Sequence, residues 1–209
     1  MLGPSRWKAV ALAAACLAVH TVLLELPRNV PALRVFGGSW NWSGKIFALA
    51  GSLLFVPLIA TADRRRWLRV PAWDPVVYLG LAAIAILSFV VPLAFADSMP
   101  FDAETIAFQL TMPTLDEELL YRGILLSLLL HATGSRTAPV WITGLLFGLA
   151  HVSIASFDVL TFARTFAFGL VFGWLTIRSD RSLLPAAFLH STTNTLPFLA
   201  QMLTGVTAP

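Results

Sequence analysis

Residues 115–130 of this 209-residue chain read LDEELLYRGILLSLLL, so that a cluster of charged residues runs directly into an apolar stretch. The whole chain is 57% hydrophobic and only 12% charged, whereas a soluble domain carries about 25% charged residues. Several uncharged runs approach the length of about 20 residues that a helix needs to cross a bilayer. This composition excludes a water-soluble enzyme, a disordered chain and a secreted disulfide scaffold, and it predicts a polytopic membrane protein.

The apolar runs predict an all-α fold, a polytopic membrane bundle of about seven transmembrane helices, with an eighth if one more segment enters the membrane. Residues 27–44 and 97–105, which both contain proline, are expected to be loops. The predicted spans are 7–26, 45–62, 75–96, 106–130, 137–157, 159–177 and 183–203.

The Lys and Arg residues between the predicted spans indicate the orientation of the chain. Cytoplasmic loops are enriched in Lys and Arg, and the run Asp63–Arg69 is the most basic segment of the sequence. We therefore expect an integral protein of a bacterial plasma membrane with a cytoplasmic N-terminus and an external C-terminus. The basic residues are then explained by the orientation of the chain in the membrane, and nucleic acid is not an expected partner. In this orientation Arg6, Lys8, Arg64, Arg65, Arg66, Arg69, Arg136, Arg178 and Arg181 lie on the cytoplasmic side, and Arg28, Arg34 and Lys45 lie on the opposite side.

Charged residues inside the predicted spans are concentrated between positions 116 and 122. Each such charge costs about 2.5–3.5 kcal/mol at the centre of a transmembrane helix, so the cluster needs compensation or a use. Glu118 and Arg122 are four residues apart on a helix, and this spacing predicts an internal ion pair. Glu117 points in another direction, about 100° away. It is therefore the carboxylate that we expect to remain free for proton chemistry, whereas Asp116 receives no role from the sequence.

Two later spans carry complementary polar groups. The segment 147–151, Phe-Gly-Leu-Ala-His, ends on His151, and the segment 190–194, His-Ser-Thr-Thr-Asn, places His190 and Asn194 on one helical face. His151 and Asn194 lie at a similar predicted depth to Glu117. Each residue alone also fits interhelical hydrogen bonding, but together they match the groups that activate water and stabilise an oxyanion. The remaining polar residues of the spans are interpreted as structural: His20, His131 and Arg164.

These motifs resemble, in order and spacing, those of the CAAX protease and bacteriocin-processing (CPBP, or Abi) family of intramembrane proteases. The segment 117–123 resembles the family's EExxxR motif, 147–151 its FxxxH motif and 190–194 its HxxxN motif. The resemblance covers about residues 113–200. It implies one integrated membrane domain in which residues 1–112 supply N-terminal helices and loops and residues 113–203 form the catalytic core.

What the resemblance implies is an intramembrane endopeptidase similar to the type II CAAX prenyl endopeptidases. Its substrate would be a membrane protein, or a lipidated or C-terminally anchored peptide, within the lipid bilayer. By motif position, the resemblance assigns the activation of water to Glu117 and His151, oxyanion stabilisation to His190 and Asn194, and support of the site to Glu118 and Arg122.

Cofactor use and two other functions stay open at the level of the sequence. The resemblance implies a glutamate-dependent mechanism without metal, although the family has also been described as metalloproteases. No HExxH motif occurs, but zinc remains an alternative because the chain holds enough ligand types. A non-catalytic membrane scaffold or immunity protein is the main alternative function, and a transporter is a further one, although no inverted repeat is visible. The alternative zinc ligands are Glu117, Glu118, His151 and His190.

Overall fold

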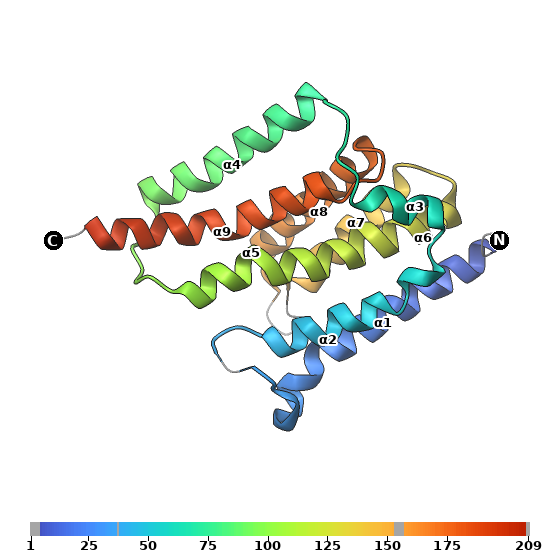
Figure 1. Cartoon of the computed structure of the whole chain (residues 1–209), viewed down its shortest axis with the longest axis horizontal. Coiled ribbons are helices and arrows are strands. Elements are labelled where there is room, and N and C mark those ends of the chain that lie inside the picture. The colour runs from blue at the N-terminus through green and yellow to red at the C-terminus, as the bar shows by residue number, and fades with distance from the viewer. Residues whose placement is uncertain (1–4, 37, 153–156, 208–209) are drawn as a thin grey trace.

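The computed structural model describes residues 5–36, 38–152 and 157–207, and within them every regular element is a helix (Figure 1). This confirms the predicted all-α bundle. The α-helices are α1 (Arg6–Asn29), α2 (Trp42–Leu53), α3 (Thr61–Trp67), α4 (Pro75–Phe95), α5 (Ala103–Glu117), α6 (Leu126–Thr133), α7 (Ala138–Ala150), α8 (Val159–Arg178) and α9 (Leu184–Thr207). The short 3-10 helices η1 (Pro31–Leu33) and η2 (Val56–Leu58) and the π-helix η3 (Glu118–Leu125) complete the set.

Three helices in the described part of the chain, α1, α4 and α8, are long and apolar enough to cross a membrane. Shorter apolar helical segments cover Trp42–Leu58 and Ala138–Ala150. Large hydrophobic side chains are exposed on the outside of these helices, which is the surface that lipid would cover. The chain is therefore an integral membrane protein.

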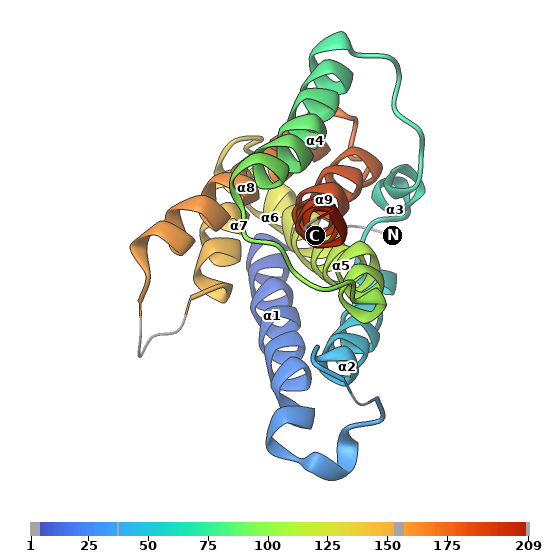
Figure 2. The ribbon, with the colours of Figure 1, turned by 90° about the vertical axis from the view of Figure 1, so that its left-hand side faces the viewer.

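The charged segment of the sequence lies at the centre of the bundle. Helices α5, η3 and α6 follow one another without a break, and Figure 2 shows α5 beside α9 in the middle, with α4 on one side, α1 and α2 on the other, and α7 with α8 on a third. In η3 every residue except Leu119 is buried, including Glu118 and Arg122. In a π-helix the chain is wound more widely than in an α-helix, and such segments are frequent at functional sites.

The second predicted span, 45–62, is wrong at its C-terminal end. Helix α2 ends at Leu53, and the chain continues as the short helix η2 around Pro57. Proline has no N–H and its ring clashes with the carbonyl four residues earlier, here that of Leu53, so Pro57 favours a helix end at this position. The residues expected to form a cytoplasmic loop, Asp63–Arg69, lie mostly within α3, whose Trp67 is buried.

Other boundaries differ less from the prediction. Helix α7 ends at Ala150 rather than near 157, and residues 153–156 of that predicted span lie outside the described part of the chain. Helix α5 begins at Ala103, within the predicted loop 97–105, because the side chain of Asp102 accepts a hydrogen bond from the backbone N–H of Glu104 and caps the helix.

Helices α7 and α8 approach each other through glycines. A Cβ atom on Gly169 would lie 2.8 Å from the Cα atom of Gly144, so only glycine permits this contact. The close approach also brings the backbone carbonyl of Gly169 to within 3.4 Å of the Arg122 guanidinium. The small residues of α8 thus help to hold the buried charge in η3.

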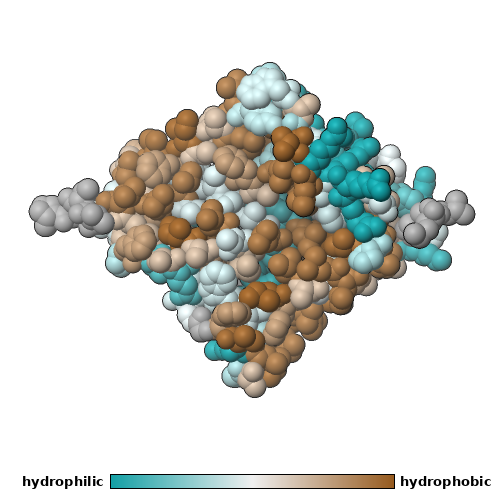
Figure 3. Space-filling model, in the orientation of Figure 1, coloured by the Kyte–Doolittle hydropathy of each residue, from teal (hydrophilic) through white to brown (hydrophobic). Residues whose placement is uncertain are grey.

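The end of the bundle that contains α3 is the most hydrophilic surface in view, as the teal patch in Figure 3 shows. Three ion pairs connect α3, the start of α4 and the turn between α8 and α9. The Arg178 guanidinium beside Asp74 lowers the pKa of that carboxyl. The three pairs are Arg66–Asp180 at 2.7 Å, Arg178–Asp74 at 2.7 Å and Arg181–Asp63 at 2.6 Å.

Candidate active site

The structure brings the sequence-predicted site residues together from three parts of the chain. Glu117 is the last residue of α5, and Glu118 and Arg122 follow it in η3. His151 comes directly after the end of α7. Both residues of the third motif, His190 and Asn194, lie on α9.

Glu117 is the point at which the two motif histidines meet. Its Oε2 atom lies 3.7 Å from Nε2 of His151 and 3.7 Å from Nε2 of His190. The same oxygen is buried and has no hydrogen-bond partner among the described residues. One carboxylate oxygen and two imidazole nitrogens therefore converge on a common point, each slightly too far from the carboxylate for a direct hydrogen bond.

The orientation of His151 follows from its own helix. Its Nδ1 atom lies 2.7 Å from the backbone carbonyl oxygen of Phe147, four residues earlier. Because a carbonyl only accepts hydrogen bonds, Nδ1 carries the proton and donates it. In the neutral ring, Nε2 then presents its lone pair towards Glu117. The Phe147 ring packs against the same imidazole with a centroid separation of 4.5 Å, so both parts of Phe147 fix the histidine.

His190 is held by the neighbouring ion pair. Its Nδ1 atom lies 2.7 Å from Oε1 of Glu118, and Oε1 also accepts a hydrogen bond from Arg122 at 3.1 Å. The ion pair predicted from the spacing of Glu118 and Arg122 is therefore present. A carboxylate that accepts from both partners fixes Nδ1 of His190 as a donor, which leaves Nε2 directed towards Glu117.

Arg122 is buried between aromatic rings and polar acceptors. Its guanidinium carbon lies 4.5 Å from the centroid of the Phe147 ring and 5.0 Å from that of Phe172, so the cation contacts two ring faces. Its solvent-exposed fraction is 1%. A guanidinium buried in this way cannot contact a substrate. Its contacts indicate that Arg122 holds Glu118 in position.

Glu117 is not free, and here the sequence-based expectation is wrong. The Lys45 ammonium, from the first turn of α2, lies 2.5 Å from Oε1 of Glu117 and 3.1 Å from Oδ2 of Asp116. Lys45 was expected on the outer side as a topology residue, but its side chain is 12% exposed and points into the site. A signal was present, because three carboxylates between 116 and 118 face a single Arg122 within the cluster. That excess of negative charge requires a cation from another helix.

His20 also has polar neighbours, which its sequence did not indicate. Its Nδ1 atom lies 3.4 Å from Oδ1 of Asp116 and 3.3 Å from the Ser52 hydroxyl oxygen. Helices α1 and α2 thus join the buried network through Asp116, which is fully buried. These contacts agree with the structural role that we expected for His20. They also show that His20 has polar partners, which the sequence did not predict.

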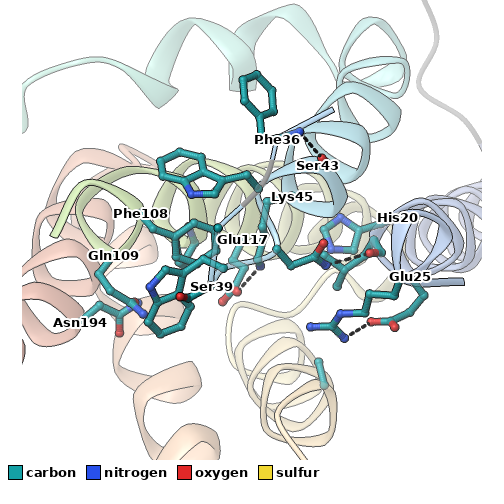
Figure 4. Close-up of a pocket in the computed structure, with 18 of the residues that line it drawn as sticks. His20, Glu25, Phe36, Ser39, Ser43, Lys45, Phe108, Gln109, Glu117 and Asn194 are labelled. Atoms are coloured by element: carbon teal, nitrogen blue, oxygen red, sulfur yellow. Dashed lines mark hydrogen bonds and ion pairs between the residues drawn. The ribbon is translucent and has the colours of Figure 1, made fainter. Parts of the chain in front are cut away.

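Asn194 lies in the wall of a cavity of about 970 Å³, which we call the polar cavity. Glu117, Lys45 and His151 line the same cavity. Figure 4 shows Asn194 and Gln109 on one side of it and His20 and Glu25 on the other. The buried Gln109 received no role from the sequence, and no motif marks it.

The described residues form no preformed group of metal ligands. Within residues 5–36, 38–152 and 157–207, no group of three or more His, Cys, Asp or Glu side chains is arranged so that it could hold a metal ion. Structural and catalytic zinc sites use at least three protein ligands at about 2.0–2.3 Å from the metal. The sequence names Glu117, Glu118, His151 and His190 as alternative zinc ligands, and the expectation that the protein uses no metal stays a prediction.

Comparison with known proteins gives one match. The model of the family described as "Type II CAAX prenyl endopeptidase Rce1-like" matches residues 101–196, which contain all three motifs. No curated protein and no solved structure matches the chain significantly. The family match confirms the resemblance that the motifs indicated.

Proposed function

We propose that the protein is an intramembrane endopeptidase with Glu117 as its general base, on the premise that residues 101–196 match the Rce1-like family of type II CAAX prenyl endopeptidases. The family supports a protease that acts on membrane-associated proteins in general. The observation that carries the more specific proposal is the convergence of Glu117 Oε2 with Nε2 of His151 and Nε2 of His190, each 3.7 Å away.

Activation of water uses the two groups that can only accept at this point. A water molecule donates one hydrogen bond to Glu117 and the other to Nε2 of His151, whose Nδ1 proton is committed to Phe147. As the water oxygen attacks the carbonyl carbon of the scissile peptide bond, Glu117 takes its proton. A C–O bond forms, and the carbonyl electrons move to the oxygen of a tetrahedral intermediate.

The intermediate then needs hydrogen-bond donors and a proton for the leaving group. Asn194 donates from its amide, and His190, with a proton on each nitrogen, donates through Nε2 to the oxyanion and through Nδ1 to Glu118. Glu117 returns its proton to the amine as the C–N bond breaks, which restores the carboxylate. Glu118 and Arg122 take no part in proton transfer and keep His190 in place.

The decisive assay uses purified protein in detergent with a fluorogenic membrane peptide. Glu117→Gln preserves size and shape but removes the base, and we expect cleavage to fall by about 10²-fold or more. His151→Ala should lower the rate of cleavage by a similar factor. The double variant should be only slightly slower than either single variant, because the effects of residues that act as a unit are not additive. Asp180→Asn, an exposed acid at the far end of the bundle, is the matched control.

Two results would contradict the proposal. If Glu117→Gln cleaves as fast as the wild type, Glu117 is not the base, and a non-catalytic membrane scaffold becomes the better description. If chelators abolish cleavage and zinc restores it, then Glu117 and His151 act as metal ligands instead. We expect chelators to leave the rate unchanged.

A further inference from the structure

Two cavities meet at the candidate active site. The polar cavity contains Glu117, and a second cavity of about 690 Å³, which we call the side cavity, contains His190. Three residues line both: Gln109, His151 and Asn194. A peptide that passes from one cavity to the other must therefore cross the groups proposed to perform hydrolysis.

The polar cavity is bounded by the connection between α1 and α2. Arg34 and the segment 38–43 line it, and Glu104 at the start of α5 holds this segment in place. The Glu104 carboxylate accepts hydrogen bonds from the backbone N–H of Ser39 at 3.2 Å and from the indole N–H of Trp42 at 3.1 Å. The cavity therefore has an ordered, polar and aromatic rim.

This rim lies at the end of α1 opposite to the basic loops. Helix α1 has 24 residues, so its ends are about 36 Å apart, and Figure 1 shows α3 near its beginning and the α1–α2 connection at its other end. At the rim, Arg28 is paired with Glu25 at 2.6 Å, and Lys45 is buried against Glu117. Lys and Arg residues are nevertheless more numerous at the α3 end than at the rim, which carries Arg28, Arg34 and Lys45. The positive-inside rule therefore places the α3 end in the cytoplasm.

The side cavity has a different character. Apolar side chains of α4 line it, namely Ile84, Leu87 and Val91, together with Phe168 of α8. Leu87 and Val91 are 57% and 48% exposed, so the cavity reaches the surface of α4 that faces lipid. An apolar segment can enter it from the bilayer along this face of α4, whereas the exposed Arg164 of α8 lines another part of the cavity.

We propose, resting on the proposed protease function, that the substrate is a membrane-anchored protein cut on the non-cytoplasmic side. Its polar juxtamembrane segment occupies the polar cavity, and the adjoining apolar anchor occupies the side cavity. The scissile bond then lies beside Gln109, His151 and Asn194. A lipidated tail on the cytoplasmic side would meet the α3 end of the bundle, at the end of α1 opposite to the rim of the polar cavity.

Cysteine labelling of intact cells tests the orientation. Ser39→Cys places a thiol on the exposed rim, and Arg65→Cys places one on the exposed surface of α3. The native Cys16 is buried and supplies the background. We expect an impermeant maleimide to label Ser39→Cys in intact cells, and to label Arg65→Cys only after the membrane is opened. The reverse pattern would overturn the proposal.

Two reporters that share one cleavable sequence test the substrate class. One carries a transmembrane anchor that places the sequence outside the cytoplasm, and the other carries a lipidated tail inside. We expect only the anchored reporter to be cut in cells. In detergent the membrane no longer separates the enzyme from either reporter, so both can reach the active site. Cleavage of the lipidated reporter in cells would refute the proposed side. If neither reporter is cut in detergent, the protease function itself fails.

The occupant of the side cavity is tested separately. Leu87→Gln adds a polar group to the cavity wall, and we expect it to raise KM for the anchored reporter about tenfold while kcat changes little. A short soluble peptide with the same cleavage sequence should be cut equally by both proteins. Leu79→Gln is the matched control, because Leu79 is exposed on the same helix. Equal KM values for the wild type and Leu87→Gln would show that the anchor does not bind there.

Discussion

The buried pair Glu118–Arg122 and the exposed pair Arg66–Asp180 each join an arginine to a carboxylate, yet we expect them to contribute differently to stability. The exposed pair is the shorter, at 2.7 Å against 3.1 Å. Its side chains are 43% and 64% exposed, whereas those of Arg122 and Glu118 are 0% and 3% exposed. An exposed pair contributes about 0–1 kcal/mol, while the loss of one partner from a buried pair costs about 3–5 kcal/mol. Burial, rather than distance, decides how much each pair matters.

The largest effect is expected at the buried pair. Arg122→Ala leaves the buried Glu118 carboxylate without its guanidinium partner and with only the contact to His190, so we expect a loss of about 3–5 kcal/mol in stability and a marked drop in the level of folded protein. Activity should fall as well, because His190 loses the fixed position of its acceptor. Thermal unfolding in detergent and the peptide assay measure the two effects.

A charge-neutral double variant sharpens this prediction. Arg122→Met keeps a long side chain against Phe147 but removes the charge, and Glu118→Gln removes the charge of its partner. We expect the double variant to recover much of the stability lost by Arg122→Met alone, but not the activity. A well-expressed and fully active Arg122→Ala protein would show that the pair has no part in either.

Lys45 lies between the two extremes, because its ion pair borders the polar cavity rather than an apolar interior. We expect Lys45→Met to cost about 2–3 kcal/mol, less than Arg122→Ala, since water in the cavity partly hydrates Glu117 and Asp116. The rate of cleavage should also fall, because Glu117 loses the contact that positions it. Thermal unfolding in detergent and kcat in the peptide assay are measured on the same preparation of the variant. If Lys45→Met leaves both unchanged, the 2.5 Å contact is without consequence.

The same contrast explains which parts of the site the sequence could predict. The Glu118–Arg122 pair is local, four residues apart on one helix, and its spacing alone predicts it. The motif histidines were recognised from the order of three motifs. Lys45 and Glu117, by contrast, are 72 positions apart, and no local pattern joins residues of α2 to residues of α5. Only the excess of negative charge in the cluster pointed to a missing cation.

The fold was predictable to a similar extent. Long apolar runs identified α1, α4 and α8, because length and composition suffice to define a membrane helix. The break between α2 and α3 was missed because Pro57 lies within an apolar run, whose hydropathy conceals the interruption. The basic segment after it was taken for a loop. It forms a short helix because Trp67 packs into the core and its backbone carbonyl accepts a hydrogen bond from Leu183.

The smallest effect is expected at the exposed pair Arg178–Asp74, and it should depend on pH. Asp74→Asn removes the charge, but an asparagine can still cap α4, as Asp74 does through the backbone N–H of Val76. The pair lowers the pKa of Asp74 in the folded protein, so its contribution is present above the pKa of the unfolded chain and is lost as the pH falls through the lower folded value. We therefore expect Asp74→Asn to lower Tm slightly at pH 7 and at low salt, and the difference from the wild type to shrink in strong acid and at high salt. Unfolding curves in detergent across pH and salt measure this difference. A Tm loss as large as that of Arg122→Ala would mean that exposure does not weaken the pair, and the comparison between the two regions would fail.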